Sequence, residues 1–205
     1  MDPESWLDEC LKTYDANEML DIARWQEVCE ADDSDELGAQ DGREILYLMQ
    51  DMREFELYGT VDVFLCMLDS LNYLLSEDEV TDVFKLVKNY LNPGGLFVFD
   101  VNTFFKYDEI LSDNTFVFEQ DNIFYTWENC FDGEYCDFRL NFFVKNKNGS
   151  YDRMCEEHSQ RYHSIEELKH IINECGLTLE AVYSELTEKS PGVDDQRVFF
   201  VVKNQ

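Results

Sequence analysis

The chain has 205 residues and carries 45 Asp and Glu against 16 Lys and Arg, which gives a net charge of −29. This length suits one folded domain. An aromatic content of 15% excludes a wholly disordered chain. No apolar run approaches the ~20 residues that a membrane span needs. The acidic surface would repel nucleic acid and anionic lipid, so cations, basic proteins and small uncharged metabolites remain as partners.

The first part of the chain is predicted to be helical. Residues 18–30 carry apolar side chains at near-helical spacing after a capping Asn17, and an acidic, glycine-containing loop follows over 31–42. Three short apolar runs come next, and they fit strands of a parallel sheet covered on both faces. These runs are Ile45–Met49, Val61–Leu68 and Leu96–Phe99.

A helix is expected between the second and the third run. Ser76 and Glu79 have the spacing of a capping box, apolar residues recur at helical spacing as far as Leu91, and the turn Asn92–Gly95 follows. Strand, helix, turn and strand in this order make the crossover unit of an α/β fold.

The pattern becomes antiparallel after residue 114. Four strand-like stretches over 115–162 are separated by turn signals, of which Asp132-Gly133 and Asn148-Gly149 favour hairpins. We predict an antiparallel insert at 115–162 within a domain made of 1–114 and 163–205. A second capping box at Ser164 begins a helix that ends at Gly176, and a closing hairpin follows.

The seven cysteines are odd in number and lack C-x-x-C spacing, which indicates a reduced, cytoplasmic chain. The sequence also begins without the basic and then apolar stretch of a signal peptide, so none is expected. Cys155 and His158 are three apart in a predicted strand and therefore point to opposite faces. We expect no metal site, even with His163 nearby, because zinc needs three or four converging ligands.

An acidic residue follows each predicted parallel strand: Asp51, Asp69 and Asp100. Ligands of open α/β sheets bind at this rim. Carboxylates there accept hydrogen bonds from ribose hydroxyls, exocyclic amines or ammonium groups, so we expect these acids to face a cationic or adenosine-like ligand. The alternative is that they only cap helices and turns.

Five segments follow one another in an order known from one enzyme family. They are Tyr14–Leu20, Gln50–Arg53, Cys66–Tyr73, Leu91–Asp100 and Gln196–Val202. In this order they resemble the motifs of class I S-adenosylmethionine-dependent methyltransferases, most closely of small bacterial enzymes with a similar insert. The resemblance implies a Rossmann-like α/β sheet, an antiparallel β insert that covers the site, and S-adenosylmethionine as cofactor.

The resemblance also implies roles for single residues. At the adenosine end, Asp15 would bind the ribose hydroxyls, Asp51 would accept the adenine amino group, and the ring would contact Ala16, Met19 and Met52. The methionine end would be lined by Met67, Leu68, Asp69 and Ser70, and Tyr73 would lie near the transferred methyl. No catalytic residue is assigned, because alignment is the main demand of methyl transfer and an amine that binds neutral needs no base.

The substrate is expected to be a small molecule held by residues of the strand rim and the insert. The candidates are Asn102, Trp127, Glu128, His158 and Arg161. Tyr125 and Tyr162 would join Trp127 in an aromatic wall for a cation. The alternatives are hairpin core for the aromatic residues and pairing with nearby acids for His158 and Arg161. His163 and His170 are expected at the surface.

One part of the family pattern is missing. A Gly-x-Gly-x-Gly loop should lie well before Asp15, but the first glycine is Gly38, and residues 1–14 are predicted as a short acidic helix. Either the chain is truncated at its start or it is a degenerate methyltransferase, which leaves a non-catalytic acidic interaction module as the alternative function. A missing central strand would expose sheet edges and favour a homo-oligomer.

Overall fold

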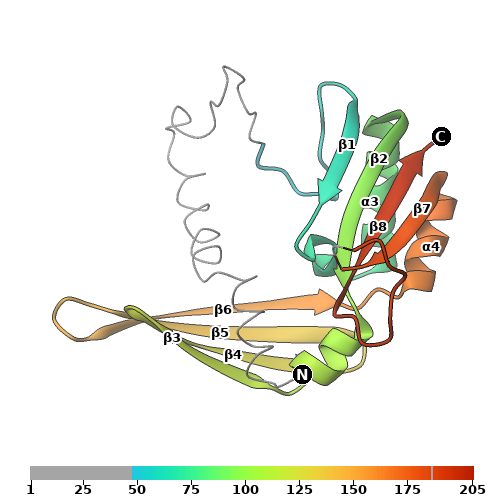
Figure 1. The fold of residues 1–205 in the computed structure, drawn as a ribbon. Helices are drawn as coiled ribbons and strands as arrows, with labels where there is room; N and C mark the ends of the chain where they lie inside the picture. Colours follow the sequence, from blue (N-terminus) through green and yellow to red (C-terminus); the bar gives the residue numbers. More distant parts are fainter. Residues whose placement is uncertain (1–47, 186) are drawn as a thin grey trace. The chain divides into compact units, whose positions relative to one another are not determined.

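The computed structural model describes residues 48–185 and 187–205 (Figure 1). The chain divides into two compact units, Met1–Gln50 and Asp51–Gln205, and the second contains every strand and helix described below. The expected strand Ile45–Met49 is not seen at Leu48 and Met49, which lie in irregular, exposed backbone. The rest of that strand, the predicted helix at 18–30, and Asp15, Ala16 and Met19 lie outside the described residues.

The described residues form two four-stranded sheets, and the first has the order β1-β2-β8-β7. Its members are β1 (Val61–Cys66), β2 (Leu91–Asn102), β7 (Leu177–Ser184) and β8 (Arg197–Asn204). β1 runs parallel to β2, whereas β8 lies antiparallel to both of its neighbours. The predicted crossover and closing hairpin are confirmed, and within the described part of the chain β1 pairs with β2 alone.

Both predicted capping boxes begin helices. α3 (Glu77–Tyr90) and α4 (Ile165–Glu174) are capped by Ser76 and Ser164, whose Oγ atoms accept from the backbone N–H three residues later at 3.3 and 3.1 Å. After α4 the chain reverses at Gly176, whose φ of +70° favours glycine.

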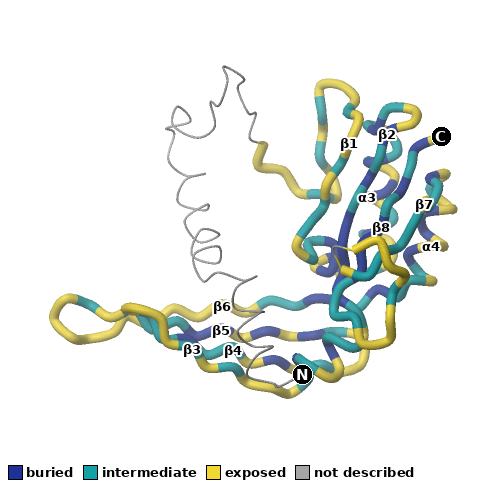
Figure 2. Tube along the Cα trace, in the orientation of Figure 1, coloured by how far each residue is buried: buried dark blue, intermediate teal, exposed yellow. Residues whose placement is uncertain are grey.

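The two helices contribute to one apolar core with the first sheet. Phe97 and Phe99 of β2 pack against Phe84 of α3, and Phe99 stacks on Phe200 of β8 at 4.7 Å between ring centroids. The central strands β2 and β8 are accordingly the most buried part of this sheet (Figure 2). On β1, by contrast, Val63 and Leu65 are 51% and 68% exposed, so the described residues do not cover both faces as expected.

The second sheet is the predicted antiparallel meander. Its strands are β3 (Thr115–Gln120), β4 (Ile123–Phe131), β5 (Tyr135–Lys145) and β6 (Tyr151–Arg161). The turns at Gly133 and Gly149 have φ of +102° and +85°, which explains the predictive value of Asp-Gly and Asn-Gly. The division into 1–114 with 163–205 and an insert at 115–162 stays a prediction, because the compact units separate after Gln50 instead.

Two short helices lie after the parallel strands. η1 (Ser70–Tyr73) follows β1, and the π-helical η2 (Lys106–Leu111), which the sequence pattern did not predict, follows β2. No helix in the described residues is long and apolar enough to cross a membrane. The five cysteines in the described part of the chain are free thiols.

Candidate functional site

A strained turn follows β1 at the carboxyl end of the parallel strands. Leu68 and Asp69 have φ of +59° and +50°, a region that is costly for residues other than glycine. Leu68 is 65% exposed and Tyr73 is 46% exposed, so the turn presents apolar surface at the rim where α/β folds bind ligands. Ser70 Oγ donates to the carbonyl of Met67 at 2.7 Å and closes the turn.

Asp69, Asp100 and Arg197 form an ion-pair network beneath this turn. Arg197 donates from Nη2 to Asp69 Oδ1 at 2.5 Å and from Nη1 to Asp100 Oδ2. The backbone N–H of Asp69 donates to the same Oδ2 at 2.9 Å. Asp100 is fully buried, so the expectation that it faces a ligand is wrong. Its carboxylate holds the strained turn instead.

Gln160 of β6 connects the meander to this network. Its Nε2 donates to Asp69 Oδ2 at 2.6 Å, and its Oε1 accepts from Tyr107 Oη at 2.9 Å and from Asn102 Nδ2 at 3.2 Å. Asn102 is only 1% exposed, and its Oδ1 accepts from Lys106 Nζ at 2.9 Å. The predicted residue Asn102 therefore lies at the rim, but its amide is engaged by the protein itself.

His158 lies beside Tyr73 at the same rim. Its ring centroid is 5.5 Å from that of Tyr73 and 5.1 Å from that of Phe138. Burial lowers the pKa of His158 and outweighs the opposing effect of Glu156 and Asp69. Burial also raises the pKa of Tyr73 to about 12. Both side chains are therefore neutral at pH 7.

Trp127 shares one face of the meander with His158 and belongs to an aromatic layer. Its ring lies 5.6 Å from Phe116 and 6.0 Å from Phe138, and Tyr125 on the same face is 8% exposed. The Nε1 of Trp127 is buried and has no hydrogen-bond partner among the residues that the structure describes. Hairpin packing accounts for these aromatic residues, whereas their contact with a substrate stays a prediction.

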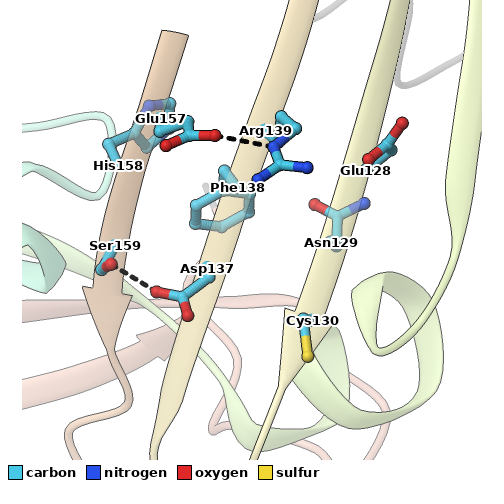
Figure 3. A pocket seen from close by; sticks show the side chains of 9 residues that line it. All are labelled: Glu128, Asn129, Cys130, Asp137, Phe138, Arg139, Glu157, His158 and Ser159. Carbon is cyan, nitrogen blue, oxygen red and sulfur yellow. Dashed lines mark hydrogen bonds and ion pairs between the residues drawn. The ribbon is translucent and has the colours of Figure 1, made fainter.

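Glu128 lies on the opposite face. It sits across from Arg139, whose Nε donates to Glu157 Oε1 at 2.7 Å (Figure 3). A hollow of about 550 Å³ here is also lined by Cys130, Asp137 and Ser159, and by Asn129, Phe138 and His158 of the same strands. Neighbouring residues of a strand point to opposite faces, so Glu128 and Trp127 lie on opposite faces of the meander, and the contact of Glu128 with a substrate stays a prediction. No group of three or more metal-ligating side chains converges within 48–185 or 187–205.

Arg161 is buried and bound by other protein groups. It is 9% exposed, and it donates from Nε to Glu134 Oε1 at 2.9 Å and from Nη1 to Glu167 Oε1 at 2.5 Å. Its carbonyl accepts from Asn72 Nδ2 at 2.9 Å. Arg161 thus joins the end of the meander to α4 and η1, in line with the alternative of pairing with nearby acids, and its contact with a substrate stays a prediction.

His163 was expected at the surface but is 1% exposed, so that expectation was also wrong. Burial lowers its pKa, and its Nε2 lies 3.0 Å from the carbonyl oxygen of Leu74. A neutral ring with the proton on Nε2 donates to that carbonyl, which leaves Nδ1 to accept from Arg161 Nη1 at 3.0 Å. His170, as predicted, is exposed, beside Glu174.

The described residues of the expected adenine segment make contacts of their own. Arg53 donates to both carboxylate oxygens of Asp51, at 2.9 and 2.6 Å, and lowers the pKa of Asp51 to about 2. Met52 packs against the core of the first sheet. Their roles at adenine stay predictions, as do those of Asp15, Ala16 and Met19 outside the described residues.

Two residues of the network were missed by the sequence analysis. Gln160 stands two positions after His158 in a predicted strand, so the alternation of faces could have placed both on one side. Arg197 opens the last strand, and no local signal indicates that it pairs with Asp69 and Asp100, because the strand order that brings them together is a tertiary property.

The known proteins compared with this chain are described as methyltransferases. No protein-family profile matches it. YqeM of Bacillus subtilis (strain 168), named for an inferred methyltransferase activity, is 36% identical over 159 residues, which cover 76% of this chain and 64% of YqeM. A protein of Geobacillus sp. (strain WCH70) with the same description is 34% identical over 162 residues, covering 78% and 65%. The chain thus spans slightly less than two thirds of these relatives.

The solved structures decide the fold family. An S-adenosylmethionine-dependent methyltransferase from Clostridium acetobutylicum ATCC 824 superposes with a TM-score of 0.75 at 28% identity, over 92% of this chain and 72% of that one. The chain is a relative of the class I S-adenosylmethionine-dependent methyltransferases. The CcbJ methyltransferase of Streptomyces caelestis has the same fold, with a TM-score of 0.66 at 16% identity over 77% and 67% of the two chains. The resemblance inferred from the five motifs is thereby confirmed.

Proposed function

We propose that this methyltransferase relative transfers the methyl group of S-adenosylmethionine to a small-molecule acceptor at the rim of its first sheet, in the cytoplasm. Activity, cofactor and acceptor are all part of the proposal, because the chain spans less than two thirds of its curated relatives. The observation that carries it is the strained turn Leu68–Asp69. It is held from below by Arg197 and from the meander by Gln160.

The residues of the turn suit the methionine end of the cofactor. Leu68 and Tyr73 leave apolar surface exposed at the carboxyl end of β1, where a thioether-like chain would pack. Met67 and Ser70 fix the turn through their mutual hydrogen bond, and both carboxylate oxygens of Asp69 brace it through protein contacts. When bound, S-adenosylmethionine supplies a methyl group activated by a sulfonium.

The residues of the chain would position the reactants and provide an apolar surface around them. Methyl displacement needs the nucleophile, carbon and sulfur in line, and holding reactants in such a geometry lowers a barrier by ~7–11 kcal/mol. His158 of the meander contacts Tyr73 at the rim, and the aromatic layer around Trp127 lies on the same face of the meander as His158. We infer that this arrangement orients a small acceptor and limits the access of water.

Calorimetric titration of the full chain with S-adenosylmethionine tests the proposal. We expect a dissociation constant in the micromolar range, and we expect Leu68→Asp to weaken it at least about tenfold because a charge replaces apolar contact. Val117→Asp, at an exposed apolar position on the meander, is the matched control and should not change it. Millimolar or absent binding would contradict the proposal and favour the non-catalytic alternative.

A further inference from the structure

His158 is an ionisable side chain of the rim that has no hydrogen bond to the described residues. Both oxygens of Asp69 are engaged by Arg197 and Gln160, and Asp100 is fully buried. The imidazole of His158 has ring contacts with its two aromatic neighbours, but neither nitrogen hydrogen-bonds to a residue within 48–185 or 187–205. A half-buried imidazole with uncommitted nitrogens can still exchange a proton.

The position of His158 is fixed from two sides. Gln160, two residues later on the same face of β6, is hydrogen-bonded to Asp69 of the strained turn. Arg161, the next residue, is held by Glu134 and Glu167. The ring itself lies between Tyr73 and Phe138. His158 is thus held at a set distance from the turn rather than carried on a free loop, as a catalytic group requires.

We propose that His158 is the base that removes the proton from the acceptor nucleophile, and this rests on the function proposed above. The lone pair of an acceptor nitrogen or oxygen forms the new bond to the methyl carbon. The carbon–sulfur bond breaks, and its electron pair remains on sulfur. The proton of the acceptor N–H or O–H passes to the unprotonated nitrogen of His158 and then to water. The acceptor class is therefore a protic amine or hydroxyl compound.

The surroundings of His158 suit this role. Burial keeps the imidazole neutral before the reaction, and the carboxylates of Asp69 and Glu156, which favour its charged form, stabilise the imidazolium afterwards. Phe138 of β5, which packs on the ring of His158, carries no charge that would affect its protonation. The hydroxyl of Tyr73 cannot take the role, because its pKa of about 12 means that it still carries its own proton at neutral pH.

Nuclear magnetic resonance of the imidazole carbons tests the inference without an acceptor. The full chain is titrated between pH 5 and 9 alone, with S-adenosylmethionine and with S-adenosylhomocysteine, and His158→Gln assigns the signal. The two ligands differ by a methyl group and a positive charge on sulfur. If His158 faces the methyl, S-adenosylmethionine should lower its pKa by at least about 0.5 more than S-adenosylhomocysteine does. The signal of the exposed His170 serves as internal control and should not distinguish the two complexes.

The outcomes separate the two proposals. If neither ligand binds, the proposed function fails for this chain, and the role of His158 fails with it. If both bind and His158 titrates alike in the two complexes, the function stands and the role of His158 is overturned. Where the wild type also methylates any of ethanolamine, benzylamine or catechol, His158→Gln should slow that reaction about 10²–10⁴-fold at pH 7. An unchanged methylation rate in His158→Gln would also overturn the proposed role of His158.

Discussion

Single buried side chains decide how the meander is attached to the rest of the unit. Arg161 was a candidate substrate contact because it lies on the insert, and pairing with nearby acids was the alternative. The structure instead directs its guanidinium to Glu134 and Glu167 and its carbonyl to Asn72. Alternation along a strand reveals which residues share a face, but it does not reveal which face turns to a ligand.

Arg161→Met should lower the free energy of unfolding by about 3 kcal/mol. The substitution removes one partner of a buried ion pair and leaves Glu167 and the Nδ1 of His163 without their donor. Urea denaturation followed by far-ultraviolet circular dichroism measures the change. Arg139→Met is the control, because Arg139 and Glu157 form an exposed pair on the meander. Equal effects of the two substitutions would argue against a structural role for Arg161.

His163 should make the protein less stable in acid. Its pKa is lowered in the folded state, so the unfolded chain binds the extra proton more readily, and stability falls as the pH drops below the unfolded value of about 6.5. His158 contributes in the same direction. The urea midpoint should therefore decrease from pH 7.5 to pH 5.5, and His163→Gln should reduce that decrease. His170→Gln, at an exposed site, should leave it unchanged; an identical pH dependence in all three proteins would exclude His163 as a cause.

The elements of this fold were predictable where local chemistry specifies them. Both Ser-x-x-Glu capping boxes begin helices, and Asp-Gly and Asn-Gly form the hairpin turns of the meander. What was missed depends on strands that meet only in the folded chain, above all the antiparallel pairing of β2 with β8 that places Asp100 near Arg197. The network holds Leu68 and Asp69 in a left-handed backbone, which is costly above all for Leu68.

Gln160→Leu should loosen the turn after β1 without unfolding the sheets. The amide of Gln160 is the side-chain link between β6 and Asp69, and leucine fills a similar volume but offers no hydrogen bond. Hydrogen exchange read by mass spectrometry should become at least about threefold faster in the peptide that contains residues 67–73. Ser159→Ala is the matched control, because Ser159 lies on the other face of β6 and bonds Asp137. Unchanged exchange at 67–73 would show that Arg197 and Asp100 hold the turn without Gln160.

At the scale of the whole molecule, two features act against each other. β1 pairs with β2 alone among the described strands, and Val63 and Leu65 expose apolar surface beside that edge. Such an edge favours association with a second copy. The net charge of −29 opposes it through long-range repulsion. The composition could predict the repulsion, whereas the exposed face of β1 could not be predicted, because its apolar run resembles that of a fully buried strand.

Self-association should therefore depend on salt. At about 100 μM protein and 20 mM NaCl, light scattering should give the mass of one chain, because the Debye length at this ionic strength exceeds ~20 Å and the repulsion persists. At 500 mM NaCl the charges are screened, and the weight-average mass should rise toward twice that value. Leu65→Lys should abolish the rise by placing a charge on the exposed face of β1, whereas Val117→Lys, at a similarly exposed apolar site on the meander, should leave it intact. A single-chain mass at both salt concentrations would show that the edge of β1 is not an association site, and a rise that survives Leu65→Lys would locate the contact on another surface.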